Sequence, residues 1–166
     1  TITEVEKEQK IQYLNLLADS YRGIDELEVS DSLYEEILEI DPENLLIRNN
    51  YSYYLSIRGK DLEKAKELSS LTVKREPKNP TYLDTYGWIL FKKGETKEAL
   101  KYVEAAIKNG AYNNGEVLDH YGDIMAKLGR CKEAVEAWNE AIKYDISLGE
   151  ALNEKIKHVD LNNCEY

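Results

Sequence analysis

The chain has 166 residues, of which 42% are hydrophobic and 33% charged, and its net charge is −10 at neutral pH. This mixture is typical of amphipathic helices and argues against a disordered chain. Its longest apolar runs are far shorter than the ~18 residues that a membrane span needs, and its acidic balance argues against nucleic-acid binding, which requires a basic footprint.

The negative charge is concentrated in the first quarter of the chain. Up to Asn44, thirteen acidic residues stand against three basic ones, whereas nineteen acids meet nineteen bases beyond it. An acidic arm can steer a basic partner, but we favour the simpler interpretation of a solvated helix face.

Helical periodicity predicts four helical hairpins followed by one more helix. Residues 1–10 are polar and are expected to form an extension or frayed turn that leads into the first helix. Pro42 and Pro77 end the first two hairpins, because proline cannot continue a helix. The predicted units are residues 11–43, 44–79, 80–114 and 115–146, with a capping helix over about 147–159.

An internal repeat links the third and fourth hairpins. From Leu83 to Lys108, thirteen of 26 residues recur thirty-five positions later. Composition alone would give roughly two such identities. The chain is therefore expected to be built from repeated units.

These hairpins resemble tetratricopeptide repeats, and the resemblance covers nearly the whole chain. The shared features are a repeat of about 34 residues and small residues at Gly87 and Ala99, where two helices cross. Gly94 fits the turn, where a positive φ favours glycine. The phrase around Pro80 also resembles repeats of bacterial cell-envelope proteins. The resemblance implies an all-α, right-handed superhelical solenoid with a C-terminal capping helix.

The resemblance also implies a function, because the first helices of such hairpins line a concave groove that holds a peptide or a partner helix. The expected role is a non-enzymatic interaction scaffold. Alternatives are a regulatory or targeting arm of a larger enzyme or envelope assembly, and a self-association module. The residues carried over to the groove are Asn15, Asp19, Arg22, Asn49, Tyr53, Ser56, Asp84, Trp88, Phe91, Asp119 and Asp123.

The sequence contains no convincing catalytic or metal-binding motif. Asp119, His120 and Asp123 lie within about one helical turn, but this ligand set is sparse, so no metal and no cofactor are expected. Cys131 and Cys164 have no CxxC spacing, which favours free thiols.

Four aspartates against one arginine on the predicted inner face favour a protein or peptide ligand with basic and aromatic or apolar residues. The oligomeric state stays open. Met125 is the only methionine, so we expect the sequence to be a piece of a longer chain. Its compartment stays open between the cytoplasm and, if a signal was removed, the bacterial periplasm or cell envelope.

Overall fold

The computed structural model describes residues 3–159, and within this range it contains helices and turns but no strand. The elements are α1 (Glu4–Gly23), α2 (Leu27–Ile40), α3 (Leu45–Ile57), α4 (Leu62–Arg75), α5 (Pro80–Lys92), α6 (Thr96–Ala106), the π-helical turn η1 (Ile107–Ala111), α7 (Gly115–Lys127), α8 (Cys131–Tyr144), the 3₁₀ turn η2 (Ile146–Leu148) and α9 (Gly149–His158).

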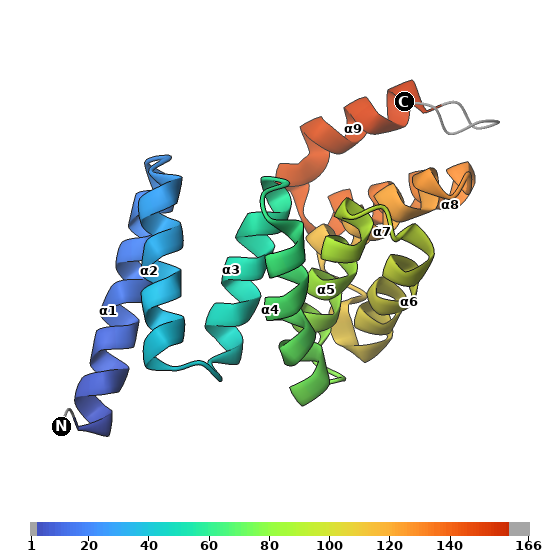
Figure 1. Cartoon of the computed structure of the whole chain (residues 1–166). Helices are drawn as coiled ribbons and strands as arrows, with labels where there is room; N and C mark the ends of the chain where they lie inside the picture. Colours follow the sequence, from blue (N-terminus) through green and yellow to red (C-terminus); the bar gives the residue numbers. More distant parts are fainter. Residues whose placement is uncertain (1–2, 160–166) are drawn as a thin grey trace.

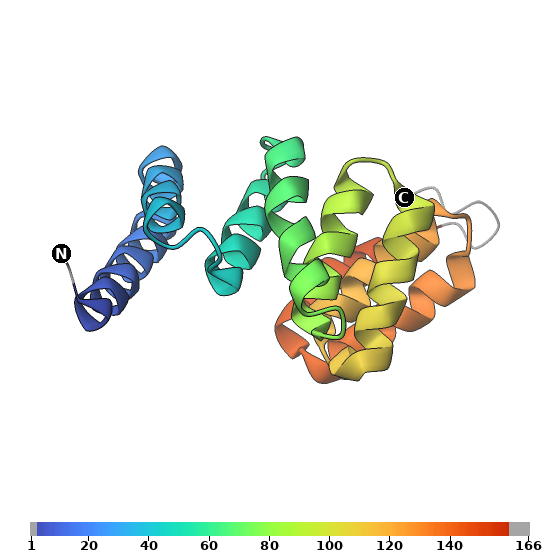
Figure 2. The same ribbon diagram turned by 60° about the horizontal axis from the view of Figure 1, so that its bottom comes forward.

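Consecutive helices pair as antiparallel hairpins, and the hairpins stack in chain order (Figures 1 and 2). The first helices of the last three hairpins, α3, α5 and α7, contact one another in turn, while α4 packs on α5 and α6 on α7. Three apolar clusters follow one another along the stack, the first under α1–α4 and the last under α7–α9. The predicted all-α solenoid is confirmed.

Small residues let the two helices of a hairpin approach closely, as predicted. A Cβ added at Gly87 would lie 2.7 Å from a methyl group of Val103 and 3.2 Å from the Ala99 carbonyl oxygen. At the equivalent Gly122, a Cβ would lie 2.4 Å from Nε1 of Trp138, which is fully buried. Both contacts are too short for any larger side chain without a shift of the facing helix.

The hairpin turns use left-handed backbone conformations. Gly59, Gly94 and Gly129 have φ angles of 64°, 83° and 76°, which confirms the turn role predicted for Gly94. Asp61 also has a positive φ of 44° and caps α4, so the second hairpin turn uses a non-glycine left-handed position as well.

The prediction that residues 1–10 form only an extension or frayed turn is wrong, since α1 begins at Glu4. Thr3 and Glu6 form a capping box in which each side chain bonds to the backbone N–H of the other residue. This reciprocal cap satisfies two N–H groups that the first turn would leave without a partner. It explains why a polar segment is helical.

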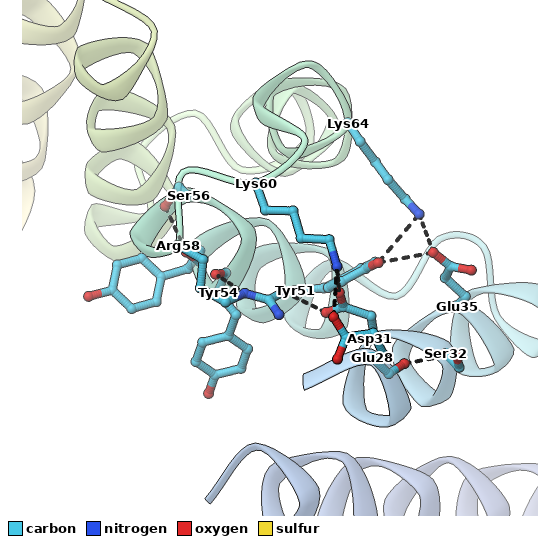
Figure 3. A network of polar contacts seen from close by, with 11 residues as sticks. Glu28, Asp31, Ser32, Glu35, Tyr51, Tyr54, Ser56, Arg58, Lys60 and Lys64 are labelled. Carbon is cyan, nitrogen blue, oxygen red and sulfur yellow. Dashed lines mark hydrogen bonds and ion pairs between the residues drawn. The ribbon is translucent and has the colours of Figure 1, made fainter. Parts of the chain in front are cut away.

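Ion pairs join the first hairpin to the second (Figure 3). Nη2 of Arg58 lies 2.6 Å from Oδ1 of Asp31, and both side chains are mostly buried, with 18% and 13% of their surfaces exposed. Lys60 reaches the same carboxylate at 3.4 Å, and Lys64 pairs with Glu35. Part of the acidic excess of the first quarter is therefore matched by bases of the second hairpin, rather than forming a wholly solvated face.

The end of the described chain returns to the fourth hairpin, where α9 packs on α8. Leu152 and Val159 join Cys131 in one apolar cluster. The predicted free thiol at Cys131 is wrong, because this residue is disulfide-bonded. Spacing along the sequence did not reveal that α9 brings the chain back to the start of α8; Cys164 lies outside the described residues.

Candidate peptide-binding groove

The predicted groove residues all belong to α1, α3, α5 and α7, the first helices of the four hairpins. Their partners differ along the stack: the carboxylates of α7 and Asp84 of α5 pair with bases of the chain, whereas several polar atoms nearer the N-terminal end have no partner.

At the C-terminal end, the two aspartates of α7 share one lysine of the same chain as their ion-pair partner. Nζ of Lys155 on α9 lies 2.7 Å from Asp119 and 2.6 Å from Asp123. Asp123 also accepts a hydrogen bond of 3.2 Å from Nε1 of Trp138. Burial nevertheless raises the pKa of Asp123, and the neighbouring Asp119 raises it further. These carboxylates hold α9 in place.

At the centre, Asp84 of α5 pairs with His120 of α7. Nδ1 of His120 lies 3.0 and 3.1 Å from the two carboxylate oxygens, and both residues are buried. Burial lowers the pKa of His120, but the Asp84, Glu116 and Asp119 carboxylates together raise it by more, so the net pKa is raised. The pair therefore favours imidazolium beside carboxylate.

Trp88 is covered on one side by the next hairpin. Its ring stacks on His120 with centroids 4.0 Å apart and on Phe91 with centroids 5.2 Å apart. Nζ of Lys92 lies 5.5 Å from the ring centroid. The indole is half-buried, and its buried Nε1 has no hydrogen-bond partner.

At the N-terminal end, Asp19 accepts a 2.7 Å hydrogen bond from the Tyr34 hydroxyl, and the guanidinium of Arg22 lies 4.2 Å from the centroid of the Tyr54 ring. Burial and this bond to Asp19 raise the pKa of Tyr34. Asn15 borders a hollow of about 340 Å³ between α1 and α3. The buried Oδ1 of Asn15 and Nε of Arg22 have no hydrogen-bond partner.

The inner side of α3 carries three predicted groove residues. Ser56 is fully buried and donates to the backbone carbonyl of Tyr53, so we leave it out of the proposed binding surface. The Tyr53 hydroxyl donates to Glu116 on α7. Asn49 is 4% exposed, and its Oδ1 has no partner.

A pocket of about 320 Å³ opens between the inner helices, and Asn49, Tyr53 and Asp84 are the predicted groove residues that border it. The complete lining is Asn49, Asn50, Tyr53, Pro80, Thr81, Asp84, Thr85, Gly110, Ala111, Asn113, Asn114, Glu116 and Val117. The segment after α6 forms one wall, and within its π-helical turn Gly110 has a non-helical φ of 128°. The lining combines amide, hydroxyl and carboxylate groups, which suits hydrogen bonding to polypeptide.

Comparison with protein families supports the repeat assignment. A family model described as tetratricopeptide repeat matches residues 11–44 and 81–109. These segments cover most of the first hairpin and nearly all of the third, and the same hairpin geometry recurs in the second and fourth. Residues 11–44 and 81–109 are therefore identified as tetratricopeptide repeats.

Two solved structures illustrate that this fold occurs in other proteins. TTC0263, a thermophilic TPR protein of Thermus thermophilus, aligns with a TM-score of 0.73 and 16% identity, over 87% of this chain and 80% of that one. One structure of the protein MamA aligns with a TM-score of 0.66 and 15% identity, over 90% and 87% of the two chains. No curated protein matched the sequence.

The four repeats place Asn15, Asn49, Asp84 and Asp119 at equivalent positions of their first helices. In the last two repeats this position is a carboxylate paired with a base of the following unit; in the first two it is an amide with an unpartnered oxygen. At this repeat position, the unpartnered side-chain oxygens of the predicted groove therefore lie in its N-terminal half.

Sequence reasoning missed several residues that shape this site. Glu116 lies at the mouth of the pocket, sixty-three positions from Tyr53. His120 was considered with Asp119 and Asp123, yet it points to Asp84. His120 follows Asp84 by thirty-six positions, and Lys155 follows Asp119 by the same number. A comparison of residues one repeat apart would therefore have signalled this pairing.

No group of three or more potential metal ligands from histidine, cysteine, aspartate and glutamate gathers within residues 3–159. Over the same range, no helix combines the length and apolar character needed to cross a membrane.

Proposed function

We propose that this protein is a non-enzymatic scaffold that binds a segment of a partner protein along the inner face of α1, α3 and α5, with the pocket between α3, α5 and α7 as its main anchor. Tetratricopeptide architecture supports a protein-interaction scaffold in general. The position of the binding surface rests on the hydrogen-bonding pattern of the inner helices.

One observation carries the proposal. Within the described part of the chain, five buried side-chain polar atoms lack a partner, and four of them belong to the predicted groove residues Asn15, Arg22, Asn49 and Trp88. Buried polar atoms are normally paired, because an unpaired one costs about 1–3 kcal/mol. An extended polypeptide offers donors and acceptors at every residue, so it can satisfy such a series.

The spacing of the helices suits such a ligand. Packed helices lie ~8–10 Å apart, and an extended chain advances ~3.3 Å per residue. Roughly three residues would therefore span from α3 to α5, which are in contact. The ion-paired half formed by Asp119, Asp123 and Lys155 offers fewer open groups and is proposed to serve mainly the packing of α9.

A selection from a random-peptide display library on the immobilised protein tests the proposal. Selected peptides are then titrated against the wild type, Asn49→Ala and the matched control Asn139→Ala, whose side chain lies exposed on α8. Asn49→Ala is expected to weaken binding about tenfold, whereas Asn139→Ala should leave it within twofold. Equal effects of the two substitutions, with both folds intact, would place the ligand elsewhere.

Self-association is a second candidate function, and the outer face of α1 favours it. Gln9 and Ser20 share this face, so its middle is uncharged in a chain with a net charge of −10. Two copies could meet there with little like-charge repulsion. The face also carries four large apolar side chains that are 62–68% exposed: Val5, Tyr13, Leu16 and Ile24.

Light scattering coupled to gel filtration tests this second candidate. The wild type is expected to dimerise, Leu16→Glu to be monomeric, and the control Ile146→Glu, at an 88% exposed position of η2, to remain dimeric. A monomeric wild type at high concentration would exclude this role for α1.

A further inference from the structure

In two repeats, a base of the following unit reaches back to the acceptor on the inner helix. His120 meets Asp84 and Lys155 meets Asp119, at an offset of thirty-six residues in both cases. The same offset from Asn49 leads to Thr85, a neutral and buried residue that lines the pocket. The chain thus supplies no base of its own at the equivalent place beside Asn49.

The pocket at this place is rich in hydrogen-bond acceptors. Asn49 is 96% buried, with 4% of its surface exposed, and its Oδ1 has no donor. Across the pocket, the Glu116 carboxylate accepts from the Tyr53 hydroxyl, and within the described range it makes no ion pair. No lysine or arginine is among the residues that line the pocket.

The charges around the pocket leave one carboxylate unmatched. Asp84 is paired with His120, whereas Glu116 makes no ion pair of its own among the described residues; it acts on the His120 charge only through space and accepts one hydrogen bond, from the Tyr53 hydroxyl. The positive ends of α5 and α7 also face this region, but Asn79 and Asn114 cap their first-turn N–H groups. Glu116 itself stands in the first turn of α7, where it offsets that helix dipole.

We propose that this pocket receives a basic side chain of the partner segment, and that the guanidinium of arginine fits it best. This inference rests on the proposed function, since it names the anchor of the same bound segment. A guanidinium has five N–H donors in a planar fork, so it can donate to Asn49 Oδ1 on α3 and to Glu116 on α7 together. An ammonium group presents a more compact point charge and bridges two helices less well.

The direct probe is N-acetyl-arginine amide, compared with N-acetyl-citrulline amide, which has nearly the same shape but no charge. Each is titrated into the isotope-labelled protein, and the NMR signals of the Asn49 side-chain amide and of residues 114–117 are followed. Arginine amide is expected to shift these signals and to bind at least fivefold more tightly than citrulline amide. Glu116→Gln should remove this preference, while Glu104→Gln, at an exposed position of α6, should keep it.

Equal binding of the two probes, or no shift at Asn49 with either, would overturn the inference. The library selection separates this failure from that of the proposed function. Selected peptides that bind in an Asn49-dependent way but contain no arginine or lysine would leave the groove proposal standing and refute the basic anchor. Selected peptides that depend on neither Asn49 nor Glu116 would refute both.

Discussion

Replacing Gly122 by alanine tests the close helix crossing of the fourth repeat. The new Cβ would lie 2.4 Å from Nε1 and 2.5 Å from Cδ1 of Trp138. Favourable separations between non-bonded heavy atoms are ~3.5–4.0 Å, so the two groups must move apart by about 1 Å. Trp138 is fully buried and its Nε1 donates to Asp123, so the ring cannot shift freely.

The expected loss follows from three effects. Overpacking costs about 1–3 kcal/mol, a weakened hydrogen bond costs about 1 kcal/mol, and alanine in a helix interior returns up to ~1 kcal/mol relative to glycine. Gly122→Ala should therefore lower the free energy of unfolding by about 2 kcal/mol.

Gly149→Ala is the matched control, because the nearest atom to its added Cβ is a methyl carbon of Ile142 at 3.8 Å, an ordinary contact. Urea unfolding followed by circular dichroism gives the change in the free energy of unfolding for both variants. Gly149→Ala should be neutral or slightly stabilising. The reasoning about the crossing fails if Gly122→Ala is as stable as Gly149→Ala with the same denaturant slope.

Three further predictions concern the ion pairs. Because the folded-state pKa of His120 is raised, its pair with Asp84 should stabilise the folded protein fully below the ordinary pKa of ~6.5, and this contribution should be lost as pH rises through the raised pKa. In His120→Gln, the urea midpoint should therefore depend less on pH over this range than in the wild type. Arg58→Met should lower the free energy of unfolding by about 1–3 kcal/mol, which is less than the loss from breaking a fully buried pair because Lys60 remains near Asp31. The rate of hydrogen exchange should rise mainly in α1 and α2. Lys155→Met should speed exchange in α9, and unchanged protection there would contradict its anchoring role.

Much of the fold was predictable because the repeat pattern encodes contacts between neighbouring helices. Gly87 and Ala99 mark a crossing by their size alone, and Gly94 marks a turn by its backbone freedom. The start of α1 was also predictable in principle, since Thr3 and Glu6 have the spacing of a capping box. The polar composition of the segment alone favours a frayed turn, but the cap stabilises the helix.

The site was less predictable, because its partners depend on where side chains point across repeats. Periodicity placed His120 beside Asp119 on one helix, but the ring turns toward Asp84 on another. The contact between Tyr53 and Glu116 joins two inner helices that are separated by a whole repeat. Helical spacing assigns residues to a face, but it does not give the curvature that brings α3 and α7 together.

The central claim is that a partner segment binds at the pocket between α3, α5 and α7. Photo-cross-linking tests it most directly: Thr81, an exposed residue of the pocket lining, and Tyr144, a 52% exposed residue at the end of α8, are each replaced by p-benzoyl-phenylalanine. A peptide from the library selection should cross-link to the protein labelled in place of Thr81 and not to the one labelled in place of Tyr144. Cross-linking at Tyr144 alone, or equal yields at both positions, would contradict the proposed binding surface.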